Sequence, residues 1–130
     1  MLDTWPYNGH TTTMDALYAG VPVVTRSDGD HMAARVTTSS NIILGIPQLN
    51  GNGVSEYESI AIKLATNITF YTSIRAHLID TCLQVEPMHP FWDVQRYTKD
   101  LETGLETAFD LFVSGNQPAH IFVGKSSNVC

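Results

Sequence analysis

A glycine, an imidazole and three hydroxyl groups follow one another in residues 8–15, NGHTTTMD. Apolar side chains recur at helical spacing just beyond, so we predict a helix over residues 11–19 that ends at Gly20. The first turn of a helix carries unpaired amides and a partial positive charge, and it therefore favours an anion. These residue types at this spacing predict a site for a phosphate-containing ligand.

The side chains of this segment suit the parts of such a ligand. Gly9 would let a diphosphate approach the backbone closely, and Thr11 and Thr12 offer hydroxyl donors. The ring of His10 is a further donor to a phosphate oxygen. Asp15 projects from the same helix face one turn later, where it is placed to accept the hydroxyls of a ribose.

A plain helix start is the alternative. Thr12 and Asp15 approximate a capping box, in which both side chains bond to backbone amides. The two interpretations are compatible and stay open. Position in the fold favours a ligand, because open α/β sheets bind ligands at the carboxyl ends of their strands, where this loop is expected.

The elements around this segment are predicted to alternate. Short apolar runs predict strands at residues 21–25 and 41–45, with a helical stretch at 31–39 between them and a turn cluster at 50–53. The basic Arg35 is expected to pair with the carboxylate of Asp28 or Asp30. His31, His77, His89 and His120 are expected to be surface or packing residues.

Helices dominate the second half. Ser55 and Glu58 form a capping-box pattern, and a second helix is expected from 69 to 84 after a break near Asn67. Asp93 is a good N-cap for a last helix that ends at Gly115-Asn116. Two apolar rows are expected to pack: Tyr57, Ile60, Ala61 and Leu64 in the first of these helices, and Val94, Tyr97, Leu101, Leu105, Ala108 and Phe112 in the last.

This order predicts an α/β fold, the C-terminal part of a Rossmann-like domain followed by packing helices. We assign residues 1–120 to this partial domain and residues 121–130 to a tail. Residues 2–4, LDT, have the pattern of a strand end that runs directly into the loop. We therefore expect the sequence to be a fragment of a longer protein.

Composition excludes several classes of function. The net charge is -6 and the seven basic residues are scattered, which argues against nucleic acid or an anionic membrane as partner. No apolar stretch is long enough for a membrane span, and the first ten residues lack the charged-then-apolar pattern of a leader, so we do not expect export through a signal peptide. Cys82 and Cys130 lie far apart without a metal-ligand spacing, so we expect no metal site and reduced thiols in a cytosolic protein.

Residues 2–25 resemble the nucleotide-binding stretch of O-linked N-acetylglucosamine transferases. The shared residues are Leu2-Asp3-Thr4, Asn8-Gly9-His10-Thr11-Thr12, Met14-Asp15, Ala19-Gly20, Pro22 and Val24-Thr25. A looser, collinear likeness continues to about His120. The first block is fairly specific to this family, whereas the later helices alone would not identify it.

The resemblance implies a GT-B glycosyltransferase, in which two Rossmann-like domains hold UDP-N-acetylglucosamine, mainly through the second. The implied contacts are His10, Thr11 and Thr12 to the diphosphate, Asp15 to the ribose, and Asn8 and Gly9 in the supporting loop. The implied reaction is inverting transfer of N-acetylglucosamine to serine or threonine hydroxyls of proteins, without metal or cofactor. The helix terminus would offset the charge of the departing UDP.

Some residues depart from this pattern. Thr13 replaces a glycine usual in the animal enzymes, and residues 5–7, WPY, lean toward plant-type protein O-fucosyltransferases that use GDP-fucose. His10 and Asp15 favour the N-acetylglucosamine branch. An inactive nucleotide-binding module is a further alternative.

In the resembling family, the acceptor-side residue and the phosphate-binding lysines come from sequence before the equivalent of Leu2. An enzyme of this kind is also expected to carry helical 34-residue repeats. We therefore assign no catalytic residue and expect the isolated chain to be inactive. The parent enzyme is expected in the cytoplasm or nucleus.

Overall fold

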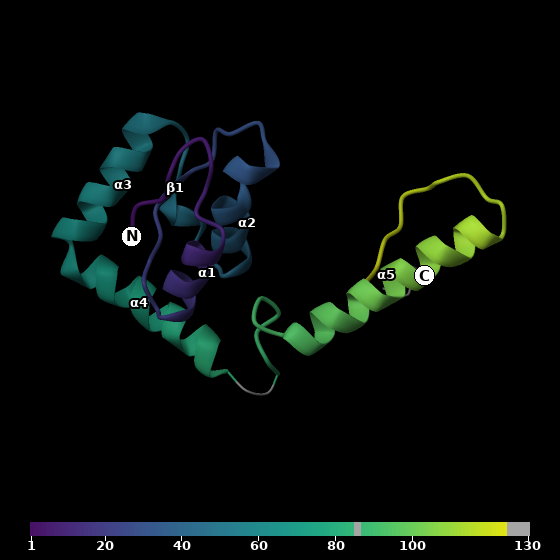
Figure 1. Ribbon diagram of the computed structural model, residues 1–130. Coiled ribbons are helices and arrows are strands. Elements are labelled where there is room, and N and C mark those ends of the chain that lie inside the picture. Colours follow the sequence, from purple (N-terminus) through teal and green to yellow (C-terminus); the bar gives the residue numbers. More distant parts are fainter. Residues whose placement is uncertain (85–86, 125–130) are drawn as a thin grey trace, which may run out of the picture. The chain divides into compact units, whose positions relative to one another are not determined.

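The computed structural model describes residues 1–84 and 87–124, which fall into two units, Met1–Phe91 and a second that begins at Trp92 (Figure 1). Each unit is described by itself. The elements of the first are α1 (Thr11–Tyr18), β1 (Thr25–Arg26), η1 (Met32–Ala34), α2 (Val36–Ile43), η2 (Pro47–Leu49), β2 (Asn50–Gly51), α3 (Val54–Thr66) and α4 (Ile68–Leu83).

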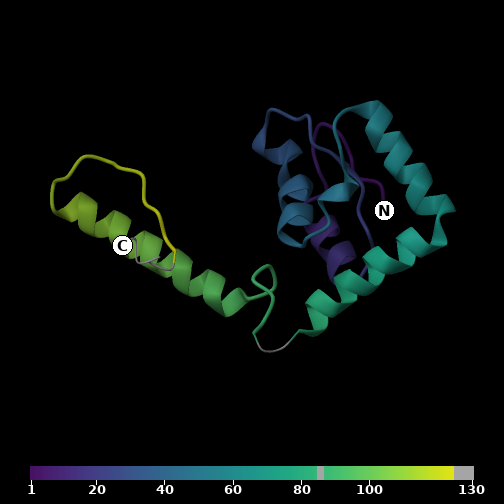
Figure 2. The ribbon, with the colours of Figure 1, turned by 180° about the vertical axis from the view of Figure 1, so that it is seen from behind.

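A small parallel sheet lies at the centre of the first unit. Thr25 of β1 pairs in parallel with Asn50 of β2, and Leu2 pairs with Val24 in a further parallel bridge. Helix α2 contacts β1, and α3 contacts both strands. The two helices lie on either side of the strands, seen from the front in Figure 1 and from behind in Figure 2.

The buried apolar core holds α1 in place. Its members are Leu17, Val23, Val24, Ala34, Leu44, Ile46, Leu49, Ile74 and Leu78. Leu17 comes from α1 and Leu78 from α4, and these two helices contact each other. Removing such side chains from water stabilises the fold by about 25 cal/mol per Å² of apolar surface.

Helix α1 confirms the helix predicted over residues 11–19. It ends as expected at Gly20, whose φ of +71° is a left-handed conformation that costs glycine little. A Cβ at this position would lie 2.8 Å from Cγ1 of Ile79. The end of α1 is therefore packed directly against α4.

The strand predicted at residues 41–45 is wrong. These residues end α2, and Asn41 is buried there, where its Nδ2 donates to the carbonyl of Val23 (3.0 Å) and to Oδ1 of Asn50 (2.8 Å). From the helix, the Asn41 side chain thus bonds both to Val23, before β1, and to Asn50 of β2. The apolar side chains of Ile42 and Ile43 are exposed. The second strand forms instead at Asn50–Gly51, inside the predicted turn cluster.

Two further boundaries differ from prediction. The strand expected at 21–25 pairs only from Val24 onward, since β1 is Thr25–Arg26. The helical stretch expected at 31–39 is divided into η1 and α2, because the backbone of Arg35 lies outside the helical region at φ -120° and ψ -1°. The chain nevertheless alternates between strand and helix as predicted.

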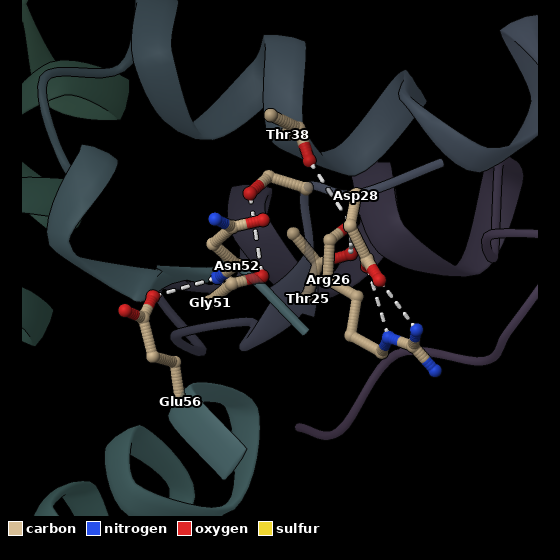
Figure 3. A network of polar contacts seen from close by, with 8 residues as sticks. Thr25, Arg26, Asp28, Thr38, Gly51, Asn52 and Glu56 are labelled. Atoms are coloured by element: carbon tan, nitrogen blue, oxygen red, sulfur yellow. Dashed lines mark hydrogen bonds and ion pairs between the residues drawn. The ribbon is translucent and has the colours of Figure 1, made fainter. Parts of the chain in front are cut away.

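Helix α3 begins differently from the predicted capping box. Its N-cap is Gly53, and Oε2 of Glu56 accepts from the amide of Asn52 at 2.7 Å (Figure 3), so Ser55 and Glu58 do not form the cap. Gly51 lies against this first turn, where an added Cβ would be 2.5 Å from the amide nitrogen of Tyr57.

The later helices of the first unit follow the prediction more closely. The expected inner face of α3 is confirmed, since its half-buried residues are Tyr57, Ile60, Ala61 and Leu64. The predicted break is confirmed as well, because Oδ1 of Asn67 accepts from the amide of Phe70 at 2.9 Å where α4 begins.

The second unit consists of α5 (Val94–Val113) and the segment that follows it. Oδ1 of Asp93 accepts from the amide of Arg96 at 2.9 Å, which confirms the N-cap, and Gly115 ends the helix at φ +71°. The apolar row expected to pack is exposed instead, with Phe112 at 79%. Val123 is the residue that lies against the helix at Gly104.

None of the helices in the described ranges is long and apolar enough to span a membrane. Cys82 is a free thiol, and burial raises its pKa. Cys130 and most of the predicted tail at 121–130 lie outside the described residues. The assignment of residues 1–120 to one donor-binding domain stays a prediction.

Candidate functional site

The loop that leads into α1 is tied to the sheet through a buried carboxylate. Oδ1 of Asp3 accepts from the amides of Gly9 (2.8 Å) and Thr4 (2.9 Å). Oδ2 accepts from Oγ1 of Thr25 at 2.8 Å. Asp3 is 8% exposed, so these bonds are shielded from water. The loop therefore has a fixed end at Gly9, one residue before His10.

Asn8 supports the loop from within the core. The backbone amide of Asn8 donates to the carbonyl of Ala33 at 2.9 Å. Its side-chain Oδ1 accepts from the backbone amide of Thr37 at 3.2 Å. Its Nδ2 donates to the carbonyl of Thr4 at 3.3 Å. The Asn8 side chain is buried and bonded to protein, so its place suits a supporting residue rather than one that touches a ligand.

Gly9 leaves room for hydroxyl groups. A Cβ at this position would lie 2.6 Å from Oγ1 of Thr12 and 3.1 Å from Oγ1 of Thr13. Its amide donates to Asp3, and so the donors left for an anion are those of the next residues. The glycine is thus needed for close approach between the loop and the first turn of α1.

The first turn of α1 is not capped by any described side chain. His10 occupies the N-cap position, and the first helical hydrogen bond runs from the amide of Met14 to the carbonyl of His10 at 3.1 Å. The predicted capping box of Thr12 and Asp15 is therefore wrong. The amides of residues 11–13 precede that first bond and have no partner within the helix, which is the arrangement that binds anions.

The three threonines separate into two groups. Thr11 and Thr12 are exposed, whereas Thr13 is buried with its hydroxyl 3.4 Å from that of Thr37. Asp15 is exposed one turn along the helix from Thr11 and Thr12. The structure thus brings two hydroxyls, the free amides and one carboxylate to the same exposed end of α1.

His10 adds an imidazole to this end. Its ring stacks on the ring of Tyr7, with centroids 4.7 Å apart and planes inclined by 20°. Its Nε2 atom is buried and has no hydrogen-bond partner among the residues that the structure describes. A buried ring nitrogen without a partner is uncommon in a folded protein, and it points to a ligand or water that completes its bonding.

A charged pair lies at the end of β1, formed by Arg26 of the strand and Asp28 just beyond it. The guanidinium of Arg26 donates to Asp28 at 3.0 and 2.6 Å (Figure 3). It also lies 4.0 Å from the centre of the Trp5 ring. The hydrogen bond from Arg26 lowers the pKa of Asp28, and the same contact raises the pKa of Arg26. This cation is therefore already paired with a carboxylate.

The predicted partner of Arg35 is wrong. Arg35 donates to the backbone carbonyl of Asp30 rather than to a carboxylate, because Asp28 is engaged by Arg26. Within the described ranges, no group of three or more His, Cys, Asp and Glu side chains could hold a metal ion.

The remaining histidines lie where the sequence predicts. His31, His77 and His120 are exposed, and Nε2 of His77 lies 2.7 Å from the carbonyl oxygen of Leu44. Burial lowers the pKa of the half-buried His89. Of these histidines, none lies at the start of α1, where His10 is the N-cap.

The model of glycosyl transferase family 41 matches residues 1–101. The chain belongs to this family. The match includes the loop, all of α1 and the small sheet. The expectation of a glycosyltransferase is thereby confirmed at the level of the family.

Curated relatives match most of this chain. A UDP-N-acetylglucosamine–peptide N-acetylglucosaminyltransferase of Caenorhabditis elegans is 36% identical over 92% of the chain and 10% of the relative. A probable enzyme of the same name from Arabidopsis thaliana, SEC, is 36% identical over 95% of the chain and 12% of the relative. This chain thus spans about a tenth of the length of these relatives.

A solved structure matches the fold. A lysine-to-methionine mutant of the Thermobaculum terrenum O-GlcNAc transferase has a TM-score of 0.71 and 34% identity, covering 82% of this chain and 19% of that chain. This likeness confirms the expected fold class, a Rossmann-like region of a glycosyltransferase.

Three buried polar residues were not assigned a role from the sequence. Asp3 and Thr25 belong to the family-like stretch, and Thr37 lies outside it. Asp3 bonds to Gly9 and Thr25 to Asn8, both in the loop, and Thr37 bonds to Thr13 of α1. The one local signal was an acidic residue at a predicted strand end, six residues before a glycine. Their contacts join segments distant in sequence, so local patterns do not reveal them.

Proposed function

We propose that this chain binds the diphosphate and ribose of UDP-N-acetylglucosamine at the start of α1, as part of a protein O-N-acetylglucosaminyltransferase. The observation that carries the proposal is the first turn of α1, which no described side chain caps, beside Nε2 of His10, which has no hydrogen-bond partner among the described residues. The names of the relatives, which specify UDP-N-acetylglucosamine, support the choice of donor.

The diphosphate would take its hydrogen bonds from the helix end. The free amides of the first turn and the exposed hydroxyls of Thr11 and Thr12 are donors, and His10 can supply one more. Asp15 is exposed, and its two side-chain oxygens are acceptors, so it suits the two hydroxyls of a ribose.

The same groups would act in the reaction. When the bond from the sugar to UDP breaks, negative charge grows on the β-phosphate, and donors fixed in advance stabilise that charge. We propose inverting transfer to serine or threonine hydroxyls of proteins, without a metal ion. A chelator should accordingly leave the affinity for UDP unchanged.

Titration calorimetry with UDP tests the site. His10→Ala and Asp15→Ala should each weaken binding by about 10-fold or more, since hydrogen bonds to charged groups are among the strong ones. His31→Ala and Asp80→Ala are matched controls, because both residues are exposed, and should leave the affinity unchanged. Unchanged binding in both site variants would remove the assignment.

Donor choice is tested in the same experiment. UDP-N-acetylglucosamine should bind, and GDP-fucose should bind more weakly; the reverse order would favour the O-fucosyltransferase alternative. We expect binding without transfer by this chain, because no acceptor-side catalytic residue is assigned in it. Transfer to a peptide by the purified chain would contradict that expectation.

The acceptor and the location belong to the same proposal. Protein acceptors are supported by the words "peptide N-acetylglucosaminyltransferase" in the relatives' names. We place the parent enzyme in the cytoplasm or nucleus, and imaging of a fluorescently tagged parent protein would test this.

A further inference from the structure

Asp3 joins the sheet to the loop before α1. Its own amide donates to the carbonyl of Val24 at 2.9 Å, and its carbonyl accepts from the hydroxyl of Tyr57 at 3.0 Å. The backbone of Asp3 is therefore held by the strand segment on one side and by α3 on the other. Its carboxylate then reaches Gly9 and Thr25 from this fixed position.

The geometry of the carboxylate leaves the loop little freedom. Its two oxygens take separate partners, the amide of Gly9 through Oδ1 and the hydroxyl of Thr25 through Oδ2, both at 2.8 Å. Both bonds are shielded from water, and burial strengthens a hydrogen bond. Gly9 is followed directly by His10, the N-cap of α1.

We propose that Asp3 is a positioning residue, whose buried carboxylate fixes Gly9 and thereby the distance between the sheet and the anion-binding first turn of α1. It touches no ligand and acts through Gly9. The inference rests on the proposed function for the identity of the ligand, but the hold on Gly9 is independent of it.

Amide hydrogen exchange, measured by NMR on the full chain, tests the hold directly. In the wild type, the amides of Gly9 and of the core residue Leu78 should both exchange slowly. In Asp3→Ala, exchange at Gly9 should become faster by about 100-fold while Leu78 changes little, as expected for a local opening. Equal acceleration at both amides, or no change at Gly9, would overturn the proposal.

Two matched variants separate positioning from general support. Tyr57→Phe removes the bond to the carbonyl of Asp3 and keeps its carboxylate, so exchange at Gly9 should stay slow. Asp3→Asn keeps an oxygen for Gly9 and should restore slow exchange, because the hydroxyl of Thr25 can accept from the new amide. If Asp3→Ala does not fold, Thr25→Val replaces it. Amide exchange at Gly9 should then again become faster by a larger factor than exchange at Leu78.

UDP affinity supplies the second measurement. Asp3→Ala should weaken binding by about 10-fold, whereas Tyr57→Phe and Asp3→Asn should stay near the wild type. If the wild type binds no UDP, the proposed function fails, and exchange at Gly9 still decides the role of Asp3. If exchange at Gly9 accelerates in Asp3→Ala but UDP affinity does not fall, Asp3 does not position the site.

Discussion

The ring of Tyr7 lies stacked on the imidazole of His10, with their centroids 4.7 Å apart. Stacked rings of this kind contribute about 0.5–1.5 kcal/mol beyond their buried area. Tyr7 is exposed, so its contact with His10 is made at the edge of the site. One face of the imidazole thus lies against Tyr7 while its Nε2 is buried.

Tyr7→Ala should therefore weaken UDP binding by about 2- to 12-fold, because the imidazole loses the ring that lies against one of its faces. Tyr7→Phe keeps the ring and should bind like the wild type. Calorimetry measures both affinities. Equal affinity of the alanine and phenylalanine variants would show that the stack plays no part in binding.

Glu56 rather than Glu58 should support the start of α3. Glu56→Ala removes the acceptor for the amide of Asn52 and should lower the free energy of unfolding by about 1 kcal/mol. Glu58→Ala is the control, since that residue is exposed on the same helix and should change little. Urea unfolding followed by circular dichroism measures the difference, and equal losses would contradict the observed cap.

Gly20→Ala should destabilise the first unit by about 2 kcal/mol, because a left-handed backbone and a collision with Ile79 act together. Gly45→Ala has a similar φ, +74°, but its nearest neighbour is the ring of His77 at 3.3 Å. It should cost about 1 kcal/mol from the backbone alone. Thermal unfolding compares the two, and a larger loss at Gly45 would contradict the packing of α1 on α4.

The ion pair of Asp28 with Arg26 should make stability depend on pH in the acid range. The pKa of Asp28 is lowered below 3.8 by the hydrogen bond from Arg26. A carboxyl whose pKa is lower in the folded state contributes stability above its unfolded pKa, and loses it as pH falls through the folded pKa. The contribution is thus complete near neutral pH and is lost below 3.8.

Asp28→Asn should accordingly lose stability relative to the wild type at about pH 5 and differ less from it at about pH 2. Asp30→Asn is the control, because the hydrogen bond found at Asp30 uses its backbone carbonyl. Urea unfolding at the two pH values measures both variants. A difference between Asp28→Asn and the wild type that is independent of pH would contradict the ion pair.

Helix ends were largely predictable because their signals are local. Gly20 ends α1, Asn67 caps α4 and Asp93 caps α5, each through a contact with residues a few positions away. The half-buried face of α3 also followed from spacing alone. The segment around His10 was found for the same reason, since a helix start with hydroxyls, imidazole and glycine is contiguous in the sequence.

The errors have a tertiary origin. Residues 42–44 form an apolar run with two β-branched residues, which resembles a strand. The buried side chain of Asn41 bonds to Val23 and Asn50 from a helix, and these distant contacts decide the structure. The role of Asp3 was missed on similar grounds, because its partners Gly9 and Thr25 lie 6 and 22 residues away.

At Gly51, where β2 leads into α3, the structure has no room for any side chain. Backbone meets backbone there, with Tyr57 nitrogen, Tyr57 Cα and the Glu56 carbonyl carbon 2.5, 2.8 and 2.9 Å from where a methyl would stand. No rotamer adjustment can relieve such crowding. In a library randomised at this codon and screened for well-expressed protein, glycine alone should survive.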